Sequence, residues 1–146
     1  VLVVSLVEAS SISLFSLILY SFIIPHPFNI FETIALFIYL LIYILVYGNL
    51  LITISILSDK SATFLLSVMI LFFFTLFGSG LIIDLNFFPS SINYFLSVFP
   101  ISMTVSAMQS YLYSGFIDWG FTLIPIFMSI SFLIINSMLI RNKLRQ

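Results

Sequence analysis

Few side chains in this sequence could take part in acid–base, nucleophilic or metal chemistry. The 146 residues include five carboxylates, four lysines and arginines, one histidine and no cysteine. Without cysteine there is no thiol nucleophile, thiolate ligand or disulfide framework. His26 stands alone, the carboxylates are scattered, and no nucleophile, base and orienting group occur together. The sequence therefore predicts no catalytic site, no metal site and no cofactor bound by this chain.

The composition is that of a protein whose surface faces lipid. Hydrophobic residues make up 62% of the chain and charged residues only 6%, whereas soluble domains carry about 25% charged residues. So few charges cannot cover a surface that faces water, so membrane lipid is the expected surrounding medium. No basic stripe suggests binding to nucleic acid. We expect an integral membrane protein.

Four apolar runs are long enough to cross a hydrocarbon core of about 30 Å at about 1.5 Å per residue. They cover residues 1–24, 31–57, 62–83 and 119–140, and their lack of alternation favours helices over a transmembrane barrel. We therefore expect an all-α membrane protein with a single transmembrane domain over residues 1–146. Its first residues, VLVVSLVEAS, include neither Met nor a positively charged segment before the apolar run. This start suggests a fragment of a longer polypeptide, with a processed or partial chain as the alternative.

The charges predict an orientation. The cations Lys60, Arg141, Lys143 and Arg145 fall in a turn and in a tail that two spans separate, so one topology places all four on the same side. By the positive-inside rule that side is the cytoplasm. We expect a multi-pass protein of the cell membrane with a cytoplasmic C-terminus, and the acidic Glu32, Asp84 and Asp118 near the outer side.

Residues 87–114 interrupt the pattern between the third and fourth spans. The apolar stretch from Phe87 to Phe99 has about thirteen residues, too few to cross the membrane at about 1.5 Å per residue. Pro89 and Pro100 suit helix starts, and Gly115 suits a helix end. The second piece is amphipathic, with one polar face made by Ser102, Ser106, Gln109 and Tyr113. These features predict two short helices that form a re-entrant hairpin, the second lying at an interface or dipping into the membrane.

The order of these motifs resembles the C-terminal half of type-2 ABC exporter permeases. The matching features are Ser79-Gly80, Phe88-Pro89, Phe99-Pro100, the segment 103–113 and Gly115, together with the 58–61 turn and the basic tail. The resemblance covers nearly the whole chain and would make its spans the third to sixth of a six-span permease. The family's first two spans and its main ATPase-coupling segment would precede Val1.

The resemblance implies transport rather than chemistry. Such permeases form dimers, homomeric or heteromeric, with a second permease subunit, and they pair with an ABC ATPase subunit on the cytoplasmic side. ATP would be hydrolysed by that partner, since no phosphate-binding loop of the G-x-x-x-x-G-K-[ST] type occurs here. The short outer helices would line or cap the export pathway.

Ten residues are candidates for such a role. Pathway or gate candidates are Glu8, Ser79, Gly80, Asp84, Pro89, Pro100, Gln109 and Asp118; candidates for contact with the ATPase are Asp59 and Lys60.

Each candidate has a plainer interpretation. An acid inside a span is a functional hypothesis, but Glu8 could also reach water at the headgroups. Ser79 and Gly80 could form a hinge or allow close helix packing. The prolines are structural helix starts. Asp118 begins a polar stripe of the last span, which could line a pathway or hold helices together. Asp59 and Lys60 could form an ordinary charged turn.

Three functions compete. The first is the membrane subunit of an ATP-driven exporter, and the second is a non-transporting accessory or remnant subunit. The third is a fragment of a secondary transporter, which would carry ionisable groups at mid-membrane and an inverted repeat. Only Glu8 meets the first of these criteria and no repeat is evident, so this function ranks last.

Overall fold

The computed structural model describes residues 29–143, and every regular element among them is a helix. The elements are α2 (Ile30–Leu57), α3 (Ser61–Gly78), the short 3-10 helix η1 (Leu85–Phe87), α4 (Ser90–Ser97), α5 (Pro100–Ser114) and α6 (Trp119–Lys143). Within this range α2, α3 and α6 are long and apolar enough to cross a membrane. The described chain is thus all-helical, as expected of an all-α membrane protein. The predicted span 1–24 lies outside the described residues.

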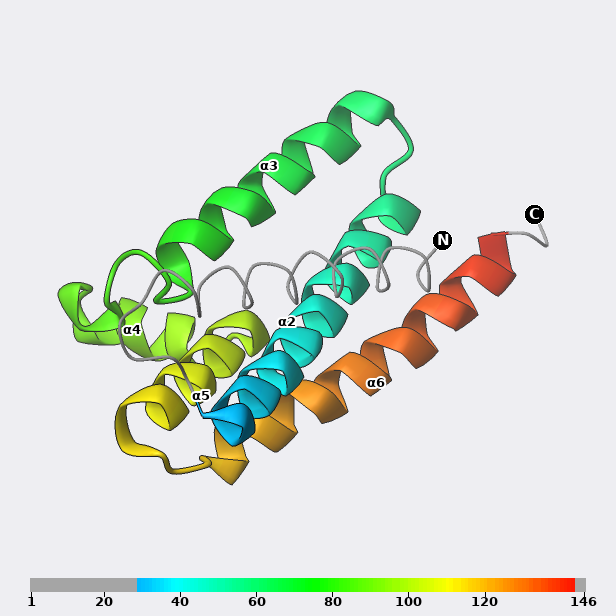
Figure 1. Ribbon diagram of the computed structural model, residues 1–146. Helices are drawn as coiled ribbons and strands as arrows, with labels where there is room; N and C mark the ends of the chain where they lie inside the picture. Colours follow the sequence, from blue (N-terminus) through cyan, green and yellow to red (C-terminus); the bar gives the residue numbers. More distant parts are fainter. Residues whose placement is uncertain (1–28, 144–146) are drawn as a thin grey trace.

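Helices α2 and α6 run parallel and side by side (Figure 1). Their polar side chains meet in successive pairs along the interface: Tyr39 with Thr122, Asn49 with Ser129, and Thr53 with Asn136. The polar stripe of α6 is therefore turned toward α2. Lipid cannot satisfy such groups, so their direct pairing stabilises this parallel arrangement.

Asn49 lies at the centre of this interface and is 1% exposed. Its Nδ2 donates to Ser129 Oγ at 2.7 Å, and its backbone oxygen accepts from Asn136 Nδ2 at 3.1 Å. Thr53 Oγ1 donates to Asn136 Oδ1 at 2.9 Å. Asn49 Oδ1 has no hydrogen-bond partner within the part of the chain that the structure describes.

Helix α5 packs into the bundle between α2 and α6, and its first half is buried on nearly all sides. Ile101 and Ala107 are 0% exposed and Val105 is 2% exposed. Pro100, at its start, lines a small cavity with Leu50 and Met128, which lie well inside α2 and α6. The sequence left open whether this helix lies at an interface or dips into the membrane; its first half packs inside the bundle instead of presenting an exposed polar face. The amphipathic pattern fails here because Ser102 and Thr104, although polar, find backbone acceptors inside the bundle.

The helix boundaries differ most from expectation at the end of α3. The apolar run predicted helix through residue 83, but α3 ends at Gly78. Gly80 then adopts φ +85°, in the left-handed region that cannot continue a right-handed helix. Hydrophobicity continues through Leu81, Ile82 and Ile83, but the backbone has already turned.

Candidate functional site

Helices α4 and α5 meet at a sharp bend, which we call the elbow. The two helices are bent by 89° across Val98 and Phe99. Pro100 occupies the first turn of α5, as predicted, whereas Pro89 is the residue before α4 rather than part of its first turn. The Phe99 ring packs edge-on against Phe74 of α3, with the ring centres 4.6 Å apart. The elbow is therefore fixed by proline geometry and by packing against α3.

The C-terminal end of α3 is held by side chains of α5. The last carbonyls of a helix have no partner within it. Here Ser102 Oγ donates to the backbone oxygen of Gly78 at 3.1 Å, and Gln109 Nε2 donates to that of Gly80 at 3.0 Å. The candidates Gln109 and Gly80 are thus in direct contact. Both contacts fix the position of the α3–α4 loop relative to α5.

An open cavity of about 720 Å³ lies between the arms of the elbow and the α3–α4 loop. We call it the elbow cavity. Of its twelve described lining residues, eight carry a hydroxyl or a carboxamide and one carries a carboxylate: Gly80, Ile82, Asp84, Leu85, Asn86, Asn93, Ser97, Ser106, Gln109, Ser110, Tyr113 and Ser114. Three of the ten candidates, Gly80, Asp84 and Gln109, therefore meet at one site.

Serines recur every fourth residue along one face of α5, and the last three of them, Ser106, Ser110 and Ser114, line the cavity. Ser102 is fully buried, Ser106 is partly buried, and Ser110 and Ser114 are exposed. Residues four apart lie on one face of a helix, about 6 Å from one to the next. These serines form a polar row that leads from the buried interior of the bundle to open space. The sequence placed Ser102 and Ser106 on a polar face but missed the four-residue repeat, which would have identified Ser110 and Ser114 as well.

The four other pathway candidates that the structure describes do not line the elbow cavity. Ser79 is 0% exposed, and its hydroxyl donates to the backbone oxygen of Thr75. Pro89 and Pro100 shape the arms of the elbow. Asp118 caps the start of α6, where its Oδ1 accepts from the backbone N–H of Phe121 at 3.2 Å. Glu8, like His26, lies outside the described residues.

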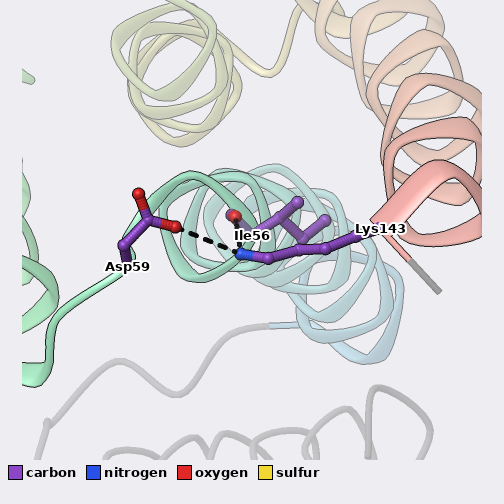
Figure 2. A network of polar contacts seen from close by, with 3 residues as sticks. All are labelled: Ile56, Asp59 and Lys143. Atoms are coloured by element: carbon purple, nitrogen blue, oxygen red, sulfur yellow. Dashed lines mark hydrogen bonds and ion pairs between the residues drawn. The ribbon is translucent and has the colours of Figure 1, made fainter. Parts of the chain in front are cut away.

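The two residues suggested for contact with an ATPase lie at the opposite ends of α2 and α3 from the cavity. Lys143 extends from the end of α6 to the end of α2, where its Nζ donates to the backbone oxygen of Ile56 at 2.8 Å and lies 3.6 Å from Asp59 Oδ1 (Figure 2). A cation near a helix C-terminus is favourable, but the ion pair is exposed and contributes at most about 1 kcal/mol. Asp59 remains 90% exposed and Lys60 is exposed at the start of α3.

The cavity beside Pro100 is apolar and has a volume of about 360 Å³. Tyr94 and Phe95 of α4 and the following Val98 line it, whereas Asn93 and Ser97 line the elbow cavity. Helix α4 thus separates a polar cavity from an apolar one.

Replacing Gly80 with alanine should destabilise the protein by about 1–2 kcal/mol, because a side chain at positive φ is strained. An added Cβ would lie 3.5 Å from Leu85 Cγ, an ordinary contact, so the cost comes from the backbone. Gly48→Ala in α2 is the matched control: no atom lies within 4 Å of its Cβ. This control should be neutral or stabilising by up to about 1 kcal/mol. Free energies of unfolding in bicelles would test both changes, and equal effects would contradict the role given to Gly80.

Comparison of this chain with protein-family models, curated proteins and solved structures found no match.

Proposed function

We propose that this chain is the membrane-spanning permease subunit of an ATP-driven ABC exporter. In this proposal it forms the translocation pathway with a second permease copy, and a separate ATPase subunit supplies the energy. The observation that carries the proposal is the serine row of α5, which runs from the buried Ser102 to three serines that line the open elbow cavity. A polar helix face beside membrane-length helices is a functional hypothesis and suits contact with a polar compound.

The parallel pairing of α2 and α6 supports a re-entrant elbow. If α2 crosses the membrane in one direction, α3 crosses back, and α6 must then cross in the same direction as α2. Helices α4 and α5 can therefore make no net crossing between α3 and α6. They would enter the membrane and return to the side on which they began. Contacts with the rest of the protein would then satisfy the polar groups of α5 within the membrane.

The charges support an assignment of sides. Lys60, Arg141 and Lys143 lie at the ends of helices opposite the elbow cavity, and the positive-inside rule places such an end in the cytoplasm. In this orientation the C-terminus of α6 is cytoplasmic and the elbow cavity opens outward. The exposed Asp59 and Lys60 would then be accessible to an ATPase subunit.

Expressed alone in a foreign host and purified, the chain should not hydrolyse ATP. Extracted from its native membrane in mild detergent, it should carry ATPase activity that vanadate inhibits.

Lys60→Glu should lower this ATPase activity about tenfold by weakening contact with the ATPase, and a tenfold change corresponds to about 1.4 kcal/mol. Arg141→Glu is the matched control, because it reverses one charge at the same end of the bundle but outside the 58–61 turn.

Two results would contradict the proposal in different ways. Hydrolysis by the isolated chain would make it an enzyme in its own right. A native preparation without ATPase activity would favour a non-transporting accessory subunit. Equal loss of activity in both charge variants would reject the 58–61 turn as the specific contact.

A further inference from the structure

We propose that the elbow cavity is a binding site for a neutral, hydroxyl-rich ligand, a saccharide or another polyol. The inference goes beyond transport, because it concerns only what the cavity binds. A chain that never transports could still hold such a ligand.

The charge of the lining disfavours ionic ligands. No lysine or arginine within residues 29–143 lines the cavity, so an anion entering it would lose hydration without gaining a counter-charge from this part of the chain. Asp84 is the one carboxylate among the described lining residues, and its Oδ1 already accepts the backbone N–H of Asn86 at 3.0 Å. A single exposed carboxylate holds a cation only weakly. A neutral ligand fits this lining best.

The hydrogen-bonding groups favour a ligand rich in hydroxyls. A hydroxyl both donates and accepts, and a carboxamide presents a donor and an acceptor side by side, so each can pair with either face of a sugar hydroxyl. Asn93 and Ser106 are partly buried and form no side-chain hydrogen bond with another described residue. An apolar ligand would bury these groups without partners, which is unfavourable.

The volume of the cavity suits one or a few sugar rings. Ligand pockets commonly measure about 300–1,000 Å³, and the elbow cavity has about 720 Å³. Tyr113 on its rim is 91% exposed and offers an aromatic face to the C–H side of a ring. An apolar compound has a better place across α4, in the cavity lined by Tyr94, Phe95 and Val98.

The test is binding to the full chain in phosphatidylcholine nanodiscs, which avoids sugar-based detergents that would compete. Maltotriose is the neutral probe, glucose 6-phosphate and glucosamine are the charged probes, and saturation-transfer NMR gives the affinities. Maltotriose should bind in a saturable way and more tightly than either charged probe. Asn93→Leu should weaken its binding about tenfold, and Ser106→Ala should weaken it several-fold.

The matched controls are Asn142→Leu and Ser131→Ala, which change exposed residues of the same types on α6 and should leave binding unchanged. A gel-filtration profile like that of the parent chain shows that each variant is folded. Tighter binding of a charged probe, no saturable binding of maltotriose, or equal weakening in the controls would overturn the proposal. Since ATPase activity is measured separately, any of these results leaves the proposed transport function standing.

Discussion

A single cysteine at position 60 should react with an impermeant maleimide only from the cytoplasmic side, and one at position 90 only from the opposite side. The chain has no cysteine of its own, and both Lys60 and Ser90 are exposed. Helix α3 has 18 residues and spans about 27 Å at about 1.5 Å per residue, enough to separate the two positions by nearly the whole hydrocarbon core. We expect each of the two positions to be labelled from one side of the membrane only.

Two further positions test whether α4 and α5 return to their side of origin. Asn142→Cys should label with Lys60→Cys, and Ser114→Cys should label with Ser90→Cys. If positions 90 and 114 label from opposite sides, the elbow is a full crossing and the re-entrant assignment fails. If positions 60 and 90 label from the same side, the topology as a whole is wrong.

Ile101→Ala should destabilise the folded bundle by about 2 kcal/mol, a roughly thirtyfold change in the ratio of folded to unfolded protein. Ile101 is 0% exposed at the start of α5. In soluble proteins such a truncation costs about 2–5 kcal/mol, as lost transfer energy plus the cost of a cavity. Between membrane helices the transfer part is small because lipid is also apolar, so lost packing dominates and the lower figure applies.

Ile134→Ala is the matched control for Ile101→Ala. Ile134 is 53% exposed on α6, and its truncation should cost less than about 0.5 kcal/mol. Steric-trap measurements of unfolding in bicelles would compare the two variants. If both truncations have similar effects, α5 is not a packed interior helix.

The long helices could be predicted from the sequence because length and hydropathy alone define them. Helix α2 covers the expected span 31–57, and α6 covers 119–140 and continues to Lys143. The helix start at Pro100 and the helix end at Gly115 were also predictable, since proline favours a first turn and Gly115 adopts φ +68°. These features depend on local chemistry.

The features that could not be predicted depend on tertiary contacts. Hydropathy does not report that Gly80 turns left-handed, so the end of α3 was placed too late. The first half of α5 is buried in the bundle because the Ser102 hydroxyl finds a backbone acceptor on α3, 24 residues away in the chain. The elbow cavity depends on an 89° bend, which brings Asn93 and Gln109 to one space although they lie on different helices. The spacing of residues in the sequence does not report these backbone conformations or the contacts that they create.

The pairing of α2 with α6 has a consequence for the order of events during synthesis. Asn49 and Ser129 are 80 residues apart, and Thr53 and Asn136 are 83 apart. At about 5–20 residues per second, α2 must wait about 4–16 seconds for its main partner. Within α2 itself, Asn49 Nδ2 donates to Leu45 O and Thr53 Oγ1 donates to Asn49 O. Because α2 is synthesised before α6, these acceptors within α2 give the Asn49 amide N–H and the Thr53 hydroxyl partners in the nascent chain before α6 exists.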